Sequence, residues 1–274
     1  MPSHNAHLNP AQRMVGKTQP KRKIIMRLPT LLLTAVSCLA LTGCGMVQNE
    51  KAFGDRVRAY LITHPEVIEE AINKLQEKQA AEASQLAQSK IAENRKALEQ
   101  DARDYVGGNP KGTVTVVEFF DYRCGYCKAA QPQVVELLKA NPDVRFVFKE
   151  FPILPDRDGK LGVSLRAARS ALAAGAQGKY GAVHEDLMAE KALDDATIAK
   201  ILTANGIDPA AAKSAGEADK VTEHLTAVHN LGLAIGIQGT PAFIVGDQLI
   251  PGADMEALKR AIEIARAKQI KPAA

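Results

Sequence analysis

The feature that most constrains this chain is an apolar segment that leads directly into two cysteines. Val116–Phe120 is apolar except for Glu118, and Cys124-Gly125-Tyr126-Cys127 follows within a few residues. The next segment, Lys128–Ala140, has a helical composition, and Pro132 within it should kink the helix. The pattern predicts a strand that delivers a C-x-x-C pair to a helix N-terminus. There the helix dipole and free backbone N–H groups stabilise a thiolate, the reactive form of cysteine.

The main alternative for the two cysteines is half of a structural zinc site. His224 and His229 have a spacing found in zinc fingers, but they lie about one hundred residues downstream rather than the usual dozen or so. On a helix they would be roughly 140° apart, so they would not share a face. We therefore favour a dithiol/disulfide centre without a metal. We expect His184, His224 and His229 to be surface or core residues.

The N-terminal segment has the composition of a secretory signal. Residues 1–43 contain six Lys or Arg and no acidic residue, and an apolar stretch covers Leu28–Leu41. This stretch is too short for a permanent membrane-spanning helix. It runs into Leu41-Thr42-Gly43-Cys44, which resembles the lipobox of bacterial lipoproteins. We therefore expect 1–43 to be a signal peptide and Cys44 to be lipidated. A signal peptidase I site is the alternative, although no A-x-A pattern stands near the end of the stretch.

Loss of this signal would change both the charge and the cysteine inventory. The whole chain has 35 Lys and Arg against 31 Asp and Glu, and without the six leader cations the net charge falls from +4 to −2. The excess of basic residues belongs to the signal, so it gives no reason to expect a nucleic-acid partner. Cys38 would leave with the signal and Cys44 would carry lipid, so the C-x-x-C pair would hold the remaining thiols. An exported chain of this kind is typical of a redox catalyst rather than of a disulfide-stapled scaffold. A start at Met26 would also leave a complete signal, and residues 1–25 would then have no structural role.

Residues 44–106 are predicted to form a tether and a helical stalk. Glu66–Val106 contains no Gly or Pro and consists largely of strong helix formers. If continuous, this helix would be about 60 Å long. Its first part carries an apolar stripe with helical spacing: Val67, Ile68, Ala71, Ile72 and Leu75. We expect a homo-oligomer to form through this stripe, with a solvated spacer as the alternative.

Gly107–Gly112 marks a predicted domain boundary, beyond which residues 107–274 form one α/β domain. Its scheme is βαβ, a helical insertion over about 157–235, and then ββα. Strands are expected at Thr113–Phe120, Val144–Glu150, Ala242–Val245 and Gln248–Ile250, and a last helix at Asp254–Lys268.

Three motifs together resemble the DsbA-like branch of the thioredoxin superfamily. They are the strand end Glu118-Phe119-Phe120, the Cys124–Cys127 pair with its Gly-Tyr dipeptide, and Gly239-Thr240-Pro241-Ala242-Phe243. With its helical extension and Gly-rich joint, the chain is most similar to the ScsC/Com1-like bacterial proteins of that branch. The resemblance implies a thioredoxin fold with an inserted helical domain, preceded by an N-terminal helical stalk.

The resemblance also implies roles for individual residues. Cys124 would be the exposed nucleophile and Cys127 the buried resolving thiol. Gly125 and Tyr126 would tune the redox poise and, together with Thr240 and Pro241, would contact the substrate. Glu118 would exchange protons with Cys127, which requires a buried carboxyl group with a raised pKa. A solvent-facing glutamate is the alternative.

Thr240 and Pro241 would form a cis-proline loop facing the cysteines. The backbone of Thr240 would then pair with an extended client in the manner of an added strand. Lys149 and Glu150, at the end of the second strand, are expected to be an ordinary surface ion pair.

The implied activity is thiol–disulfide exchange on exported proteins through a mixed disulfide, without a cofactor and with a membrane redox partner. The expected location is the periplasm-facing side of a bacterial envelope, anchored by lipid to a membrane. The Gly-Tyr dipeptide, the threonine before the proline and the stalk favour isomerisation over oxidation. A copper-handling protein that binds Cu(I) through Cys124 and Cys127 is the alternative from another class, because soft thiolates suit Cu(I). A redox-inert lipoprotein tether would not need both cysteines.

Overall fold

A computed structural model of the protein describes residues 42–160 and 162–270. The chain divides into two compact units, Met1–Ile68 and Glu69–Ala274. Most of the expected signal peptide therefore lies outside the described residues. Cys44 is described by its backbone, which belongs to helix α1 (Thr42–Thr63). No described helix is long and apolar enough to cross a membrane.

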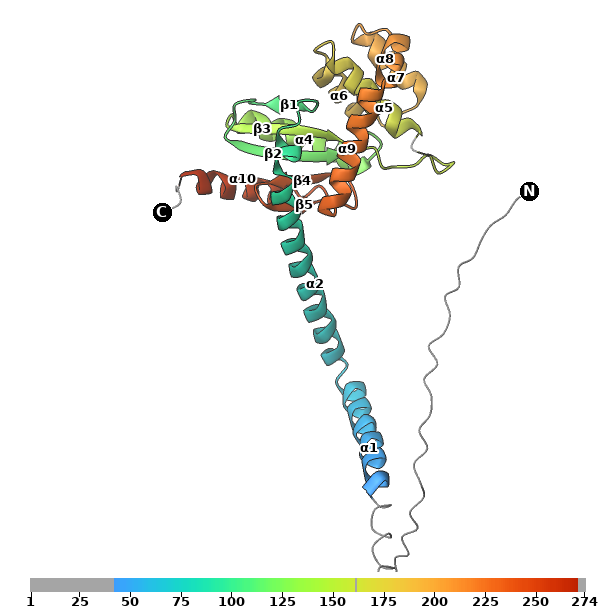
Figure 1. The fold of residues 1–274 in the computed structure, drawn as a ribbon, viewed down its shortest axis with the longest axis vertical. Coiled ribbons are helices and arrows are strands. Elements are labelled where there is room, and N and C mark those ends of the chain that lie inside the picture. The colour runs from blue at the N-terminus through green and yellow to red at the C-terminus, as the bar shows by residue number, and fades with distance from the viewer. Residues whose placement is uncertain (1–41, 161, 271–274) are drawn as a thin grey trace, which may run out of the picture. The chain divides into compact units, whose positions relative to one another are not determined.

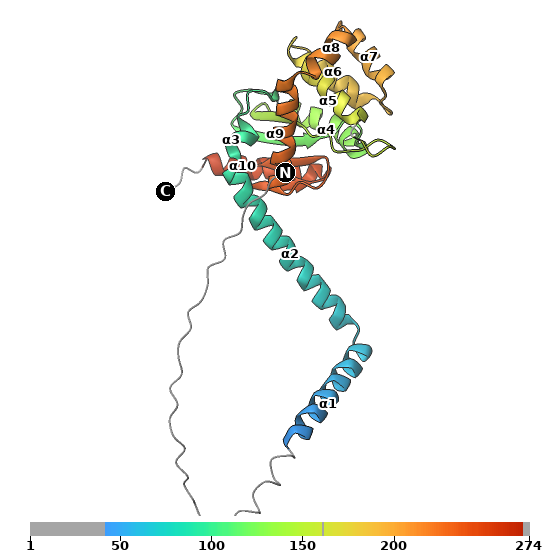
Figure 2. The same cartoon turned by 45° about the vertical axis from the view of Figure 1, so that its right-hand side comes forward.

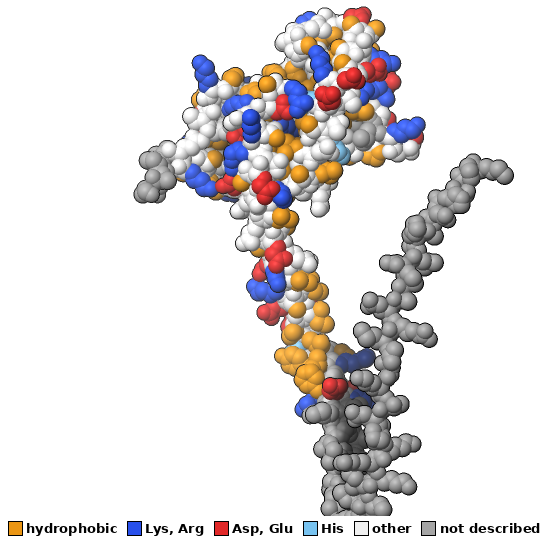
Figure 3. All heavy atoms as spheres, in the orientation of Figure 1, with side chains coloured by type: hydrophobic (Ala, Val, Ile, Leu, Met, Phe, Trp, Pro, Cys, Tyr) orange, Lys and Arg blue, Asp and Glu red, His pale blue; other side chains and the backbone are white. Residues whose placement is uncertain are grey.

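The first unit contains α1 and the start of α2 (Glu66–Glu93). His64-Pro65 separates the two helices, as expected because the residue before a proline disfavours helical dihedrals. Several large apolar side chains of this unit are exposed, among them Phe53 and Ile62. Figure 3 shows apolar side chains gathered on this part of the chain.

The second unit is built on a five-stranded sheet with the strand order β1-β3-β2-β4-β5 (Figures 1 and 2). The central strands β2 and β3 are parallel, and Glu118 on β2 lies opposite Phe148 on β3. The other three pairings are antiparallel. The strands are β1 (Tyr105–Gly108), β2 (Val114–Phe120), β3 (Val144–Glu150), β4 (Ala242–Val245) and β5 (Gln248–Pro251).

Helices cover both faces of the sheet, which explains why β2 and β3 are apolar nearly throughout. On one face, Val116 and Phe120 share a core with residues of α4 (Gly125–Ala140) and α10 (Met255–Ile270). On the other, Val117 and Phe119 pack with the end of α2 and with α3 (Arg95–Glu99) and α9 (Asp219–Ile235). The remaining helices are α5 (Gly162–Gly175), α6 (Tyr180–Ala189), α7 (Asp195–Ala204) and α8 (Pro209–Gly216). This is a thioredoxin fold with a helical insertion between β3 and β4.

The continuous helix expected over Glu66–Val106 is wrong beyond Glu93. The side chains of Ile91 and Leu98 are buried against the sheet, and the chain turns between them to keep both in the core. Residues that follow Asp104 then form β1, which pairs with β3. The Gly-rich joint is therefore partly a strand. A Cβ at Gly107 would lie 2.9 Å from the ring of Phe148, so a larger residue there would require that ring to shift. The predicted limits of the domains 44–106 and 107–274 stay predictions.

The surface ion pair expected of Lys149 and Glu150 is also wrong, because both residues are buried. Neighbouring residues of a strand point to opposite faces, so each has its own partners. Lys149 Nζ donates to Ala97 O at 2.6 Å and forms an ion pair with Asp104. The Glu150 carboxylate lies on the face of the sheet that α4 covers.

Candidate active site

Cys124 occupies the N-cap position of α4 and has an extended backbone (φ −72°, ψ 116°). Its thiol donates a hydrogen bond to the carbonyl oxygen of Thr240 at 3.1 Å. The Thr240–Pro241 peptide bond is cis. Cys124 is less accessible than expected: 6% of its surface is exposed, because the loop that carries Thr240 lies against it. The structure thus brings the two predicted motifs together across 116 residues of sequence.

Hydrogen bonds favour the ionised form of the Cys124 thiol. They lower its pKa to about 5 against the opposing effect of burial. The largest contribution comes from the Cys127 thiol, and the side chain of Thr240 and the backbone N–H groups of Cys127 and Tyr126 add to it. A thiol with this pKa is almost fully ionised at neutral pH, and the thiolate is the attacking form.

Cys127 differs from Cys124 in both exposure and ionisation. It lies in the first turn of α4, and 1% of its surface is exposed. Burial raises its pKa far above the ordinary value, and its hydrogen bond to Cys124 has the same effect. One thiol of the pair is therefore ionised and the other protonated, which is the asymmetry that a nucleophilic and a resolving cysteine require.

Glu118 is buried on β2, and its Oε2 atom has no hydrogen-bond partner among the described residues. Burial raises the pKa of this carboxyl group to about 8, and the charge on Cys124 contributes to the shift. The carboxyl group therefore exchanges its proton in the neutral range. The solvent-facing alternative for this residue is wrong, while its role in proton transfer stays a prediction.

The residues expected to contact a client lie around the Cys124 sulfur. Gly125 and Tyr126 occupy the first turn of α4, and 73% of the Tyr126 surface is exposed. On the opposite side, the cis-proline loop is joined to the end of β5 by a hydrogen bond of 2.8 Å from Gly252 N to Pro241 O. The Cys124 thiol thus lies between the first turn of α4 and the cis-proline loop.

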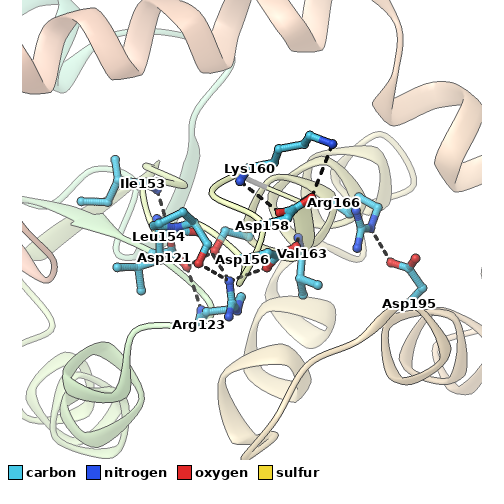
Figure 4. A network of polar contacts seen from close by, with 12 residues as sticks. Asp121, Arg123, Ile153, Leu154, Asp156, Asp158, Lys160, Val163, Arg166 and Asp195 are labelled. Atoms are coloured by element: carbon cyan, nitrogen blue, oxygen red, sulfur yellow. Dashed lines mark hydrogen bonds and ion pairs between the residues drawn. The ribbon is translucent and has the colours of Figure 1, made fainter.

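A buried carboxylate that the sequence reasoning missed holds the loop before the dithiol. Asp121 accepts hydrogen bonds from Arg123 N (2.8 Å) and Ser164 Oγ (2.9 Å), and also from Ile153 N (2.9 Å) and Leu154 N (3.0 Å). Figure 4 shows that these contacts join the end of β2, the loop after β3 and the start of α5. The sequence feature that could have revealed this residue is an aspartate between an apolar strand and the C-x-x-C pair.

The side chain of Arg123 extends the same network. Its Nη1 atom donates to Asp156 Oδ1 (2.5 Å) and to Pro155 O (3.0 Å) (Figure 4). The second oxygen of Asp156 accepts from Val163 N at 3.1 Å in the first turn of α5. The residue before Cys124 is therefore anchored to the insertion.

A second buried polar group, also missed, lies on the α4 face of the sheet. Glu150 Oε1 accepts from the hydroxyls of Tyr122 (2.9 Å) and Tyr180 (2.6 Å), and the Tyr122 hydroxyl lies 3.0 Å from His184 Nδ1. Burial raises the pKa of Glu150 to about 8 and lowers that of His184 to about 3. His184 is thus a neutral core residue at physiological pH. No cluster of three potential metal ligands occurs in the described part of the chain.

The fold and the dithiol define a thioredoxin-like protein with a C-x-x-C pair facing a cis-proline. The chain belongs to the family of DSBA-like thioredoxin domains, which matches residues 115–263. A second family, the copper resistance protein ScsC N-terminal domain, matches residues 49–82.

Individual relatives agree with this assignment. The thiol:disulfide interchange protein DsbA of Bordetella parapertussis is 30% identical over 156 residues, covering 54% of this chain and 73% of that protein. Another relative is much longer. The chain spans 24% of the Na(+)/H(+) antiporter NhaA 3 of Salinispora tropica, with 31% identity over 171 residues and 58% of this chain covered.

Solved structures show the same similarity. A thioredoxin-like oxidoreductase from Silicibacter pomeroyi is 41% identical, with a TM-score of 0.59 over 64% of this chain and 98% of that one. ScsC of Proteus mirabilis in a transitional conformation is 30% identical, with a TM-score of 0.58 over 81% and 99%. A periplasmic thioredoxin-like protein from Salmonella enterica is 30% identical, with a TM-score of 0.55 over 63% and 95%.

Proposed function

We propose that this protein is an exported thiol:disulfide oxidoreductase that forms or isomerises disulfides in envelope proteins. The observation that carries the proposal is the asymmetric pair at the start of α4. The Cys124 pKa is lowered to about 5 and its sulfur contacts Thr240 O at 3.1 Å, while Cys127 is buried and protonated. In our mechanism the Cys124 thiolate attacks a client disulfide, or a client thiolate attacks the Cys124–Cys127 disulfide, through a mixed disulfide in either case.

Glu118 is proposed as the proton acceptor for Cys127 in this cycle. Gly125, Tyr126, Thr240 and Pro241 are proposed to contact the client. The Thr240 backbone would pair with an extended segment of the client next to its reacting cysteine. The Gly-Tyr dipeptide and the threonine before the proline support isomerisation as the finer activity.

Two refolding assays test this proposal. Reduced ribonuclease reports oxidation and scrambled ribonuclease reports isomerisation, and both should recover activity faster with the mature protein. Cys124→Ser should abolish the effect in both assays. If the wild-type protein accelerates neither assay beyond Cys124→Ser, the proposed function is wrong.

We further propose a periplasm-facing location with a lipid on Cys44. The lipobox-like sequence before Cys44 supports it, and so does the similarity to a periplasmic thioredoxin-like protein. The wild-type protein should enter the detergent phase on phase separation, and Cys44→Ser should not. Recovery of the wild-type protein in the aqueous phase would contradict the lipid anchor.

We also propose two kinds of protein partner. A membrane protein would recharge the dithiol, and further copies of this chain would associate through the stripe at Val67, Ile68, Ala71, Ile72 and Leu75. Three of these side chains, Ile68, Ile72 and Leu75, are large, apolar and about half exposed, which supports association.

Copper handling remains the second candidate function. The match of residues 49–82 to the N-terminal domain of a copper resistance protein favours it, although that segment contains neither cysteine of the pair. If it is correct, the reduced protein should retain one Cu(I) against a competing chelator, and the Cys124→Ser/Cys127→Ser variant should not. Equal Cu(I) retention by both would exclude the two thiols as the ligands.

A further inference from the structure

Lys128 follows Cys127 on α4 and reaches across to the helical insertion. Its Nζ atom donates hydrogen bonds to Leu187 O at 2.7 Å and to Met188 O at 3.4 Å. Both carbonyl groups belong to the last turn of α6, where carbonyls have no partner within the helix. They also carry the negative end of the helix dipole. Lys128 therefore fixes the end of α6 beside the helix that begins at the dithiol.

The positive charge of Lys128 is not paired with a carboxylate. The residue is half-buried, and no carboxylate oxygen in the described part of the chain lies within 4.0 Å of its Nζ atom. The charged or titratable groups that face it are Cys124, Cys127, Asp121, Glu190 and His184. Removing an ammonium group from water without a partner is costly, and burial accordingly lowers its pKa to about 8. The end of the α6 dipole compensates part of this charge, and a further negative charge nearby would compensate more of it.

The resolving step creates a negative charge at the residue next to Lys128. Cys127 gives its proton to the Glu118 carboxylate, and its thiolate attacks Sγ of Cys124 in the mixed disulfide. The bond between Cys124 and the client sulfur breaks, and the client leaves as a thiolate with the electron pair. The dithiol is oxidised to the Cys124–Cys127 disulfide and the client disulfide is reduced. Until the new bond forms, a buried thiolate exists at Cys127.

We propose that Lys128 is a positioning residue of the dithiol, held by the α6 carbonyls so that its charge stabilises the Cys127 thiolate during resolution. This inference rests on the proposed function. It adds to the contact between the lysine and α6 a second role that depends on its positive charge, which a neutral donor could not supply.

Ellman's reagent, 5,5′-dithiobis(2-nitrobenzoate), separates the two steps in the reduced mature protein. The first thiol released reports attack by Cys124, and the second reports resolution by Cys127. Lys128→Met should slow the second release roughly tenfold, the equivalent of one pKa unit of thiolate stabilisation. It should leave the first release within about threefold of the wild-type rate. Lys128→Arg, which keeps the charge, should restore the second release.

Two further variants distinguish charge from structure. Lys128→Gln keeps a donor for the α6 carbonyls without the charge, and it should slow resolution as Lys128→Met does even if the Met variant folds poorly. Lys139→Met removes an exposed lysine from the last turn of the same helix and should change neither step. Wild-type resolution in the Gln variant, or equal slowing of both steps in it, would overturn the inference. A wild-type protein without any second release would refute the proposed function itself.

Discussion

At the scale of single residues, the site depends on two groups whose ionisation is shifted in opposite directions. Cys124 is surrounded by donors that favour its thiolate, whereas one oxygen of the buried Glu118 has no hydrogen-bond partner within residues 42–160 and 162–270. In the proposed mechanism, the first shift prepares a nucleophile, and the second prepares a proton acceptor for the neutral pH range.

The first residue-level prediction concerns the Cys124 thiol. The rate of alkylation by iodoacetamide, measured against pH in the Cys127→Ala variant and in the wild-type protein, should reach half its maximum well below the free-thiol value of about 8.5. The midpoint should be higher in the variant, because the hydrogen bond from Cys127 is the largest cause of the lowered pKa. A wild-type midpoint at or above about 8.5 would contradict the proposed activation.

The second concerns the stability effect of Glu118. Because its folded pKa is raised from 4.5 to about 8, the native state binds more protons than the unfolded state between these pH values. Stability is therefore lost as pH rises through this window. Glu118→Gln should increase the free energy of unfolding more at pH 8 than at pH 5, by at least about 1.4 kcal/mol. Denaturant unfolding of the reduced proteins checks this, with the exposed Glu136→Gln as a control that should show no such difference.

At the scale of helices and strands, the segment between α2 and β1 belongs to the core. Leu98 on α3 is buried in the cluster that covers one face of the sheet. Leu98→Ala should therefore lower the free energy of unfolding by about 2–5 kcal/mol. Leu75→Ala on α2 removes a side chain that is 54% exposed, and it should cost far less in a monomeric preparation. Equal effects in denaturant unfolding would show that α3 does not stabilise the sheet.

The elements that the sequence predicts well are those with strong local patterns. β3 was expected with its observed limits, and β2 to within one residue, because long apolar runs between turn signals have few alternatives. β1 was missed because two of its four residues are glycines, and its pairing with β3 is a long-range property. α8 was covered only by the general expectation of a helical insertion, although Asp208 caps it and Pro209 begins it, because the segment is short and lacks large apolar residues.

The parts of the candidate site that the sequence predicts are likewise those with a local pattern. The two cysteines and the cis-proline loop are each encoded in consecutive residues, so a motif reveals them. The hydrogen bonds of Glu150 to Tyr122 and Tyr180 join residues 28 and 30 positions apart, and Lys128 reaches residues 59 and 60 positions away. No local sequence pattern predicts such contacts.

At the scale of the whole molecule, isomerisation requires prolonged binding of the client, whereas simple oxidation does not. A misfolded client must be held while its disulfides are exchanged, and several active sites in one assembly do this better than one. Burial of the larger side chains in the stripe from Val67 to Leu75 would contribute roughly 1.5–3 kcal/mol each. Association through this stripe would therefore link oligomeric state to activity.

Truncation of the stalk tests this link. The truncation must spare Ile91 and Leu98, because both side chains are buried in the core. Removal of residues 45–104 would take both side chains from the core, so removal of residues 45–82 is the sharper design. The shorter protein should be a folded monomer that retains dithiol oxidation and loses most isomerisation. Light scattering and the two ribonuclease assays check the outcome. If the mature protein is a monomer at micromolar concentration, the stripe does not mediate association and the stalk is a spacer.

The contact between Cys124 and Thr240 has a consequence for the timing of catalysis. The thiol can donate to the Thr240 carbonyl only while the sulfur keeps its proton. Ionisation removes that donor and leaves the carbonyl oxygen ready to accept a backbone N–H from an incoming chain. In the proposed mechanism, activation of the nucleophile and release of this carbonyl for a client are thus a single event, which the lowered pKa of Cys124 completes below neutral pH.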